Sequence, residues 1–229
     1  MQATVYWPRR PRRAGSLVLT ALRGLAALAA AAGGAAAQGT APAPRDHTPA
    51  DVAFMQGMIV HHAQAVVMSD WAPTHGASPS VLLLCRRIGL SQRDEIGLMQ
   101  RWLADRQLAA PDPLHMRQGG GGPVEDRSAL HMPGMDMGEH PMMMAGMLSP
   151  AAMRQLDAAR GPTFDRLYLT GMIKHHQGAL DMVAKLFATP GGGQQPEIST
   201  FATDIDAGQR AEITRMETLL HTLTRVRTR

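Results

Sequence analysis

The amino-acid sequence predicts an all-α protein, a four-helix bundle built from two repeated helix hairpins. Three observations support this: a composition rich in helix formers, long segments that begin at helix-capping residues, and an internal repeat. Aromatic residues make up only 4% of the 229 residues, and β-branched residues are sparse beside Ala, Leu, Met, Gln and Arg. This composition argues against an all-β fold, and the length suits one globular domain, alone or with an added flexible segment.

Prolines mark the start of every expected helix, because proline is favoured at the first helical position. Thr48, Ser78 and Ser149 precede three of these prolines as N-caps. Clusters of Gly and Pro end the helices. The expected helices cover residues 49–71, 79–109, 150–159, 162–188 and 196 to the C-terminus.

Two segments of the chain repeat each other. Residues 54–68 (FMQGMIVHHAQAVVM) match residues 168–182 (YLTGMIKHHQGALDM) at an offset of 114. Residues 91–103 match residues 208–220 at an offset of 117, and the change of three residues falls in the loops. Two copies of a helix hairpin predict a bundle with pseudo-two-fold symmetry, in which a long linker spans the crossover.

The first 37 residues are typical of a secretory signal peptide. Four arginines between residues 9 and 13 precede an apolar stretch at 17–32, and three alanines at 35–37 provide a cleavage pattern. Arg23 interrupts the apolar stretch, which is short for a membrane span of about 20 residues. We expect cleavage and a bacterial protein that is periplasmic or secreted, without membrane contact afterwards. An uncleaved membrane anchor is the alternative.

The net charge of +4 does not indicate nucleic-acid binding. The signal peptide holds five arginines and no acidic residue, which leaves 18 basic and 19 acidic residues in the rest of the chain. The basicity therefore belongs to the targeting segment. The single cysteine, Cys85, excludes a disulfide framework and a multi-cysteine metal site, and its apolar neighbours predict a buried, inert thiol.

The predicted organisation has five parts. A signal peptide (1–37) and a flexible lead-in (38–48) precede the first helix-hairpin repeat (49–110). A flexible linker (111–148), rich in Met and His, joins it to a short helix and the second repeat (149–229).

Each repeat carries Met-Ile-x-His-His, followed by a Met seven residues after the first His. Residues three or four apart are neighbours on a helix, so Met58 and one of the following histidines can share a metal ion. Met68 lies about 10 Å along the helix axis from His61, which makes it a core residue or part of a separate site. The residues predicted to bind metal are Met58, His61, His62, Met68, Met172, His175, His176 and Met182.

The alternative is that these methionines fill the core and that the histidines are buried and hydrogen-bonded. Duplication copies structure as well as sites, so the repeat itself does not decide between the two. Burial of four imidazoles costs free energy unless each finds partners, however, and this favours metal binding.

A second group of candidate ligands lies in the linker, where no helix or strand period organises the methionines. Thioethers are soft ligands that select Cu(I) or Ag(I), and a segment without fixed structure can wrap around such an ion. The alternatives are a low-complexity linker and an apolar segment that docks on the bundle. The candidates are His131, Met132, Met135, Met137, His140, Met142, Met143, Met144 and Met147.

The carboxylates argue against a di-iron enzyme. Such a bundle needs Glu-x-x-His on two helices, and the sequence contains no Glu-x-x-His. Glu95 and Glu212 occupy matching places in the repeats, where each either orients a ligand histidine or lies on an exposed helix face. We expect no enzymatic activity; an oxidase acting on Cu(I) is the least favoured function.

The doubled Met-Ile-x-His-His motif, the repeated Gln-x-x-Glu-Ile-x-x-Met segment and the Met-Pro-Gly-Met linker resemble an exported bacterial family, domain of unknown function 305. This family includes copper-binding proteins of the CopM type. The resemblance covers residues 49–220 and implies a ferritin-like four-helix bundle with a role in periplasmic copper or silver handling. The family motif falls on the eight Met and His residues predicted above to bind metal.

Together these observations predict an exported protein that sequesters or transfers Cu(I) or Ag(I). Other periplasmic copper-handling proteins are the candidate partners. A helical structural or stress protein of the cell envelope, without a metal function, is the alternative. Zn(II), if bound, should occupy only the histidines and be lost as pH falls through about 6.5, whereas Cu(I) on thioethers should survive.

Overall fold

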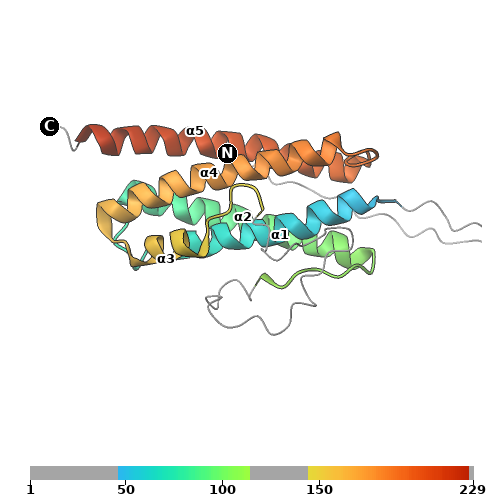
Figure 1. The fold of residues 1–229 in the computed structure, drawn as a ribbon, viewed down its shortest axis with the longest axis horizontal. Helices are drawn as coiled ribbons and strands as arrows, with labels where there is room; N and C mark the ends of the chain where they lie inside the picture. Colours follow the sequence, from blue (N-terminus) through green and yellow to red (C-terminus); the bar gives the residue numbers. More distant parts are fainter. Residues whose placement is uncertain (1–45, 114–143, 227–229) are drawn as a thin grey trace, which may run out of the picture. The chain divides into compact units, whose positions relative to one another are not determined.

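The computed structural model describes residues 46–113 and 144–226, which form five α-helices and no strand (Figure 1). The expected all-α helical bundle is thereby confirmed. The signal peptide and residues 114–143 lie outside the described residues. The helices are α1 (Pro49–Asp70), α2 (Pro79–Asp105), α3 (Pro150–Ala158), α4 (Gly161–Ala188) and α5 (Pro196–Val226).

The bundle consists of two helix hairpins, α1 with α2 and α4 with α5, which meet chiefly through α1 and α4 (Figure 1). Helices α2 and α5 have little contact with each other. Two clusters of buried apolar side chains fill the interior. Equivalent methionines of the two repeats fall in opposite clusters, as the predicted pseudo-symmetry requires: Met58 and Met99 lie in one, and Met172 and Met216 in the other.

The helix starts agree with the sequence, whereas one helix end differs. Thr48 and Asp51 form a capping box, with Asp51 N–H donating to the Thr48 hydroxyl at 3.2 Å and Thr48 N–H donating to Asp51 Oδ2 at 2.8 Å. Helix α2 ends at Asp105 rather than near Ala109. The cause is Gln107, whose φ of 57° is a left-handed conformation that breaks the helix.

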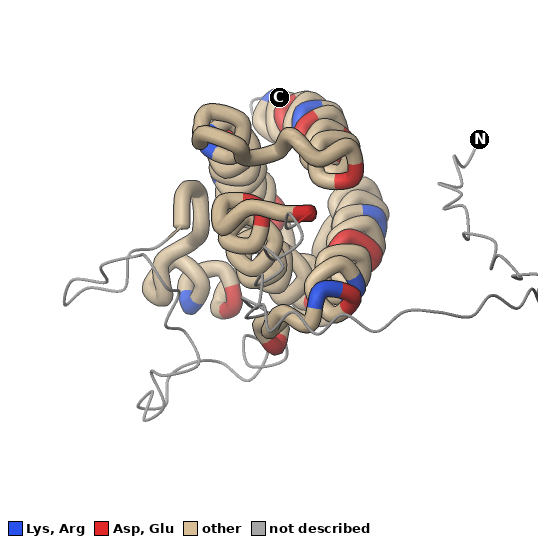
Figure 2. The backbone as a smooth tube through the Cα atoms, turned by 90° about the vertical axis from the view of Figure 1, so that its right-hand side faces the viewer, with Lys and Arg blue, Asp and Glu red and all other residues tan. Residues whose placement is uncertain are grey.

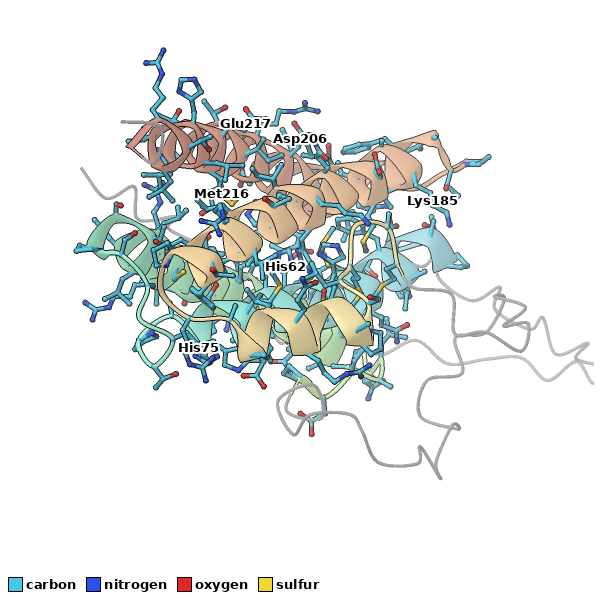
Figure 3. All side chains as sticks on the ribbon, turned by 60° about the vertical axis from the view of Figure 1, so that its left-hand side comes forward. His62, His75, Lys185, Asp206, Met216 and Glu217 are labelled. Carbon is cyan, nitrogen blue, oxygen red and sulfur yellow. The ribbon has the colours of Figure 1, made fainter. Side chains whose placement is uncertain are left out.

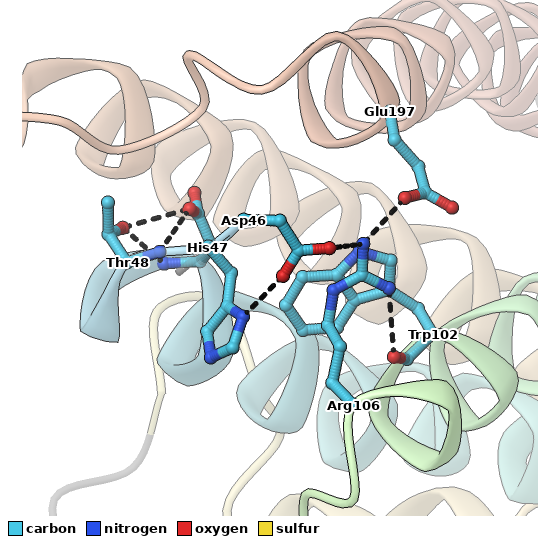
Figure 4. Close-up of polar contacts among 7 residues, drawn as sticks. Asp46, His47, Thr48, Trp102, Arg106 and Glu197 are labelled. Atoms are coloured by element: carbon cyan, nitrogen blue, oxygen red, sulfur yellow. Dashed lines mark hydrogen bonds and ion pairs between the residues drawn. The ribbon is translucent and has the colours of Figure 1, made fainter. Parts of the chain in front are cut away.

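Residues just before α1 contact the C-terminal end of α2, which in turn contacts the first turn of α5. Arg106 donates to Asp46 at 2.9 Å and to Glu197 at 2.8 Å, and its guanidinium lies 4.2 Å from the centre of a Trp102 ring (Figure 4). His47 bonds to Asp46 and meets Trp102 edge-on. The end of the predicted flexible lead-in is therefore attached to the bundle, and the rest of it lies outside the described residues.

Charged residues do not form a single-sign surface on the helices seen in Figure 2, where acidic and basic residues are interspersed. This agrees with the near balance of charges expected after the signal peptide. Among the described helices, none combines the length and the apolarity needed to cross a bilayer.

The last residues of the predicted linker pack against the bundle. We call residues 144–148 the docked segment; it lies against α1 and α4. Leu148 exchanges two hydrogen bonds with Gln64 of α1, at 2.8 Å from its N–H and 3.0 Å to its carbonyl oxygen. Of the alternatives left open for the linker, docking on the bundle therefore holds for these five residues.

Two glycines allow this close approach. A Cβ on Gly178 of α4 would lie 1.9 Å from the carbonyl oxygen of Ala145. Gly146 has a φ of 75°, and a Cβ there would lie 2.4 Å from the carbonyl oxygen of Lys174. Backbone meets backbone at this crossing, which excludes any side chain on either partner.

Gly178→Ala is therefore expected to displace the docked segment and to lower the free energy of unfolding by about 1–4 kcal/mol, from hydrogen bonds lost by buried groups. Gly208→Ala is the matched control, because Gly208 is also helical but has no other atom within 4 Å of its Cβ position. That variant should gain about 0.5–1 kcal/mol from helix propensity. Chemical denaturation measures both, and equal stabilisation of the two variants would contradict the close crossing.

Candidate metal centre

Four histidines form a row through the interior of the bundle. His61 of α1 and His175 of α4 face each other, with ring centroids 3.8 Å apart. His62 and His176 flank them, each at 6.3 Å from its neighbour in sequence. All four are at most 1% exposed. Figure 3 shows His62 inside the bundle.

A glutamate closes each end of the row. Glu95 Oε2 of α2 lies 2.5 Å from His62 Nε2, and Glu212 Oε2 of α5 lies 2.7 Å from His176 Nε2. The Glu212 side chain is 8% exposed and that of Glu95 is 22% exposed. Of the two roles that the sequence left open for these glutamates, contact with the histidines is the one the structure shows. The complete polar row is Glu95, His62, His61, His175, His176 and Glu212.

Burial keeps the two central histidines neutral. It lowers the pKa of His61 to about 3, an effect reinforced by His62, and it holds the pKa of His175 well below its ordinary value. His61 Nε2 lies 3.0 Å from the carbonyl oxygen of Ala145 in the docked segment. A carbonyl only accepts hydrogen bonds, so His61 carries its proton on Nε2 and has a lone pair on Nδ1.

One ring nitrogen of each histidine is buried without a hydrogen-bond partner among the described residues. Buried polar groups are normally hydrogen-bonded, so four such atoms in one row need an explanation. A neutral imidazole nitrogen with a free lone pair is a metal ligand, and a carboxylate on the other nitrogen typically orients it. The four atoms are His61 Nδ1, His62 Nδ1, His175 Nε2 and His176 Nδ1.

These nitrogens do not form a preassembled cage. Within residues 46–113 and 144–226, no three His, Cys, Asp or Glu side chains lie close enough together to hold a metal ion. Cys85 is buried as predicted, and burial raises the pKa of its thiol to about 12, so it stays protonated. With this thiol protonated, the soft donors available beside the histidines are thioethers, the donor type that selects Cu(I) and Ag(I).

The structure places the distal methionine of each repeat beside the other repeat. Met182 Cε lies 3.3 Å from the position that a Cβ on Gly57 would take. Met68 Cε lies 3.6 Å from the equivalent position on Gly171. Each glycine directly precedes the methionine of a Met-Ile-x-His-His motif. The distance of Met68 from His61 along α1 is thus explained: Met68 approaches the motif of α4.

Two of the linker candidates are described. Met144 Sδ lies 3.6 Å from the Cβ position of Gly57, and Met147 lines a groove between α3 and α4. The other candidates lie outside the described residues: His131, Met132, Met135, Met137, His140, Met142 and Met143.

Three buried glutamines near the row were not predicted as site residues. Gln92 and Gln209 lie one helical turn before the two glutamates, and their Oε1 atoms have no partner among the described residues. The Gln-x-x-Glu pattern that occurs in both repeats was the sequence signal that could have identified Gln92 and Gln209. Gln64 holds the docked segment, but the second repeat has Gly178 at the equivalent position, so no repetition marked it.

Comparison with known proteins identifies the relatives of this chain. The sequence model of the family described as "Domain of unknown function (DUF305)" matches residues 51–223. The chain belongs to this family. The crystal structure of a DUF305 fragment from Deinococcus radiodurans is 28% identical to it, with a TM-score of 0.58, and the match covers 77% of this chain and 98% of that one.

CopM is similar to this DUF305 protein as well. Its silver-bound form is 25% identical with a TM-score of 0.51, and its Cu(II)-bound form is 28% identical with a TM-score of 0.50. Both matches cover 75% of this chain and 96% of CopM. Uncharacterized protein L153 of Acanthamoeba polyphaga mimivirus is 36% identical over 58 residues, and the chain spans 38% of that relative's length.

Proposed function

We propose that this DUF305 protein is exported and binds Cu(I) and Ag(I), which it sequesters or transfers without catalysing a reaction. The observation that carries the proposal is the row of four buried histidines, capped at each end by a glutamate, in which every histidine has one unpartnered ring nitrogen. Thioethers of Met144 and Met182 lie beside Gly57, one helical turn before His61, and supply soft donors. The similarity to CopM, whose structures hold copper and silver, supports the same conclusion.

A purely structural role for the row is the competing account. It would leave four buried nitrogen atoms unsatisfied, at a cost of about 1–3 kcal/mol for each. The two accounts differ in the metal content of protein purified from the periplasm. We expect bound copper in the wild type and less in a variant with all four histidines replaced by alanine. Metal-free wild-type protein from copper-supplemented cells would contradict the proposal.

The depressed pKa values revise the pH dependence expected from the sequence. An ordinary imidazole protonates near pH about 6.5, and the expected loss of Zn(II) rested on that value. Because the pKa of His61 is about 3, protons compete for its ring only in stronger acid. Metal bound at His61 and His175 should therefore survive mild acid.

Without metal, the same shifts should make the fold sensitive to acid. The unfolded chain protonates its histidines near pH about 6.5, whereas folded His61 remains neutral until pH about 3. The unfolded state thus binds more protons in this window, and stability falls as the pH falls. Replacing both His61 and His175 with Gln should flatten the pH dependence of the melting temperature. Parallel curves for variant and wild type would contradict this reasoning.

Deletion of residues 119–143 is expected to lower the number of Cu(I) ions bound while leaving helicity and cooperative melting nearly unchanged, because a change in loop length costs little chain entropy. Extension of the deletion to residue 147 would remove Ala145 and Gly146 from their contacts with the bundle. That longer deletion should melt at a lower temperature. Cu(I) titration and thermal melts of both variants measure the two effects.

Equal melting temperatures for the two deletions would contradict the structural role of the docked segment. An unchanged Cu(I) number would contradict metal binding by the linker methionines.

A further inference from the structure

The docked segment breaks the pseudo-symmetry of the bundle at one particular place. Gly57 of α1 and Gly171 of α4 are equivalent positions in the two repeats. A Cβ on Gly57 would lie 3.3 Å from Met182 Cε, and one on Gly171 would lie 3.6 Å from Met68 Cε. Each of the two glycines therefore has one thioether beside it.

The remaining neighbour differs between them. At Gly57 it is the sulfur of Met144, 3.6 Å from the Cβ position. At Gly171 it is Leu148, whose two methyl carbons lie 3.2 and 3.5 Å from the Cβ position. Since a leucine fills the equivalent space, packing does not require a sulfur atom at Gly57.

The methionines at the two places also differ in solvent exposure. Met144 and Met182 are both partly exposed, whereas Met68 is fully buried. The pair at Gly57 is therefore partly open to solvent.

We propose that Met144 and Met182 form a thioether site for a monovalent soft cation, Cu(I) or Ag(I), distinct from the histidine row. This inference rests on the proposed function, because it assumes that the protein handles soft metals. Thioethers are uncharged, do not titrate and bind Zn(II) poorly. The site is consequently selective for soft ions and independent of pH. Its counterpart at Gly171 has one sulfur replaced by the side chain of Leu148 and lacks this capacity.

The test is titration of the full mature chain with Ag(I), followed by NMR of methionine methyl groups labelled with carbon-13 and of the imidazole nitrogens. In the wild type, the Met144 and Met182 resonances should shift together at the same Ag(I) equivalents, without Met68. Met144→Leu should remove the Met182 shift, whereas the matched variant Met68→Leu should leave it unchanged. Circular dichroism checks the fold of each variant.

Leu148→Met provides a test that does not depend on the loss of a side chain. By placing a second sulfur beside Met68, it should make the Met68 resonance respond to Ag(I) as Met182 does. A Met182 shift that persists in Met144→Leu, or wild-type Met68 and Met182 shifts that run in parallel, would overturn the site. If the histidine resonances shift with Ag(I) while those of Met144 and Met182 do not, the thioether site is overturned and the proposed function stands. If the protein retains no Ag(I), the proposed function is overturned as well.

Discussion

Glu212→Ala is expected to lower the free energy of unfolding by about 2–4 kcal/mol, because it leaves the Nε2 of His176 buried without an acceptor. The glutamate lies 2.7 Å from that nitrogen, and its side chain is only 8% exposed. Water therefore has little access to replace the lost carboxylate. Denaturant unfolding of the metal-free protein measures the effect.

Two matched variants set the scale. Asp206→Ala breaks an ion pair with Arg210 within α5 and should cost less than about 0.5 kcal/mol, because the two side chains are 31% and 64% exposed. Glu95→Ala should fall between the two, because Glu95 is 22% exposed. A Glu212→Ala variant as stable as Asp206→Ala would show that the row does not depend on its terminal carboxylate.

Replacement of both terminal glutamates by glutamine is expected to weaken Cu(I) binding at the histidines about 10–100-fold. The amide can still accept a hydrogen bond from Nε2–H, so the rings keep their orientation. It lacks the negative charge that makes a ligand imidazole more basic. Competition with a chromophoric Cu(I) chelator measures the change, with Asp206→Asn as the control. A Cu(I) affinity within about two-fold of the wild-type value would contradict a role for the carboxylates.

Much of the fold was predictable because its signals are local. Prolines and N-caps fix the helix starts, and the repeat fixes their pairing into hairpins. The end of α2 was misplaced by several residues, because the left-handed conformation of Gln107 has no signal as clear as the later Pro111. The burial of the histidine row also followed from the sequence, since adjacent histidines at one register of two repeats point to a shared interior.

The docked segment was not predictable in the same way. Its position depends on contacts between Gly178 and Ala145 and between Gln64 and Leu148, which are far apart in sequence and follow no period. Gln64 and Gly178 occupy equivalent places in the repeats, yet one donates a hydrogen bond and the other provides space. The asymmetry that brings Met144 to Gly57 therefore appears only in three dimensions.

The central claim is that the histidine row and the methionines bind soft monovalent ions, and a competition titration tests it most directly. Cu(I) and Zn(II) are titrated under reducing conditions at neutral pH and at about pH 5, on the wild type and on the His61, His62, His175 and His176 quadruple alanine variant. We predict tighter Cu(I) than Zn(II) binding in the wild type, with loss of Zn(II) and a share of Cu(I) in the variant. Tighter Zn(II) binding in the wild type, complete loss of Cu(I) in the variant, or no loss at all would contradict the account.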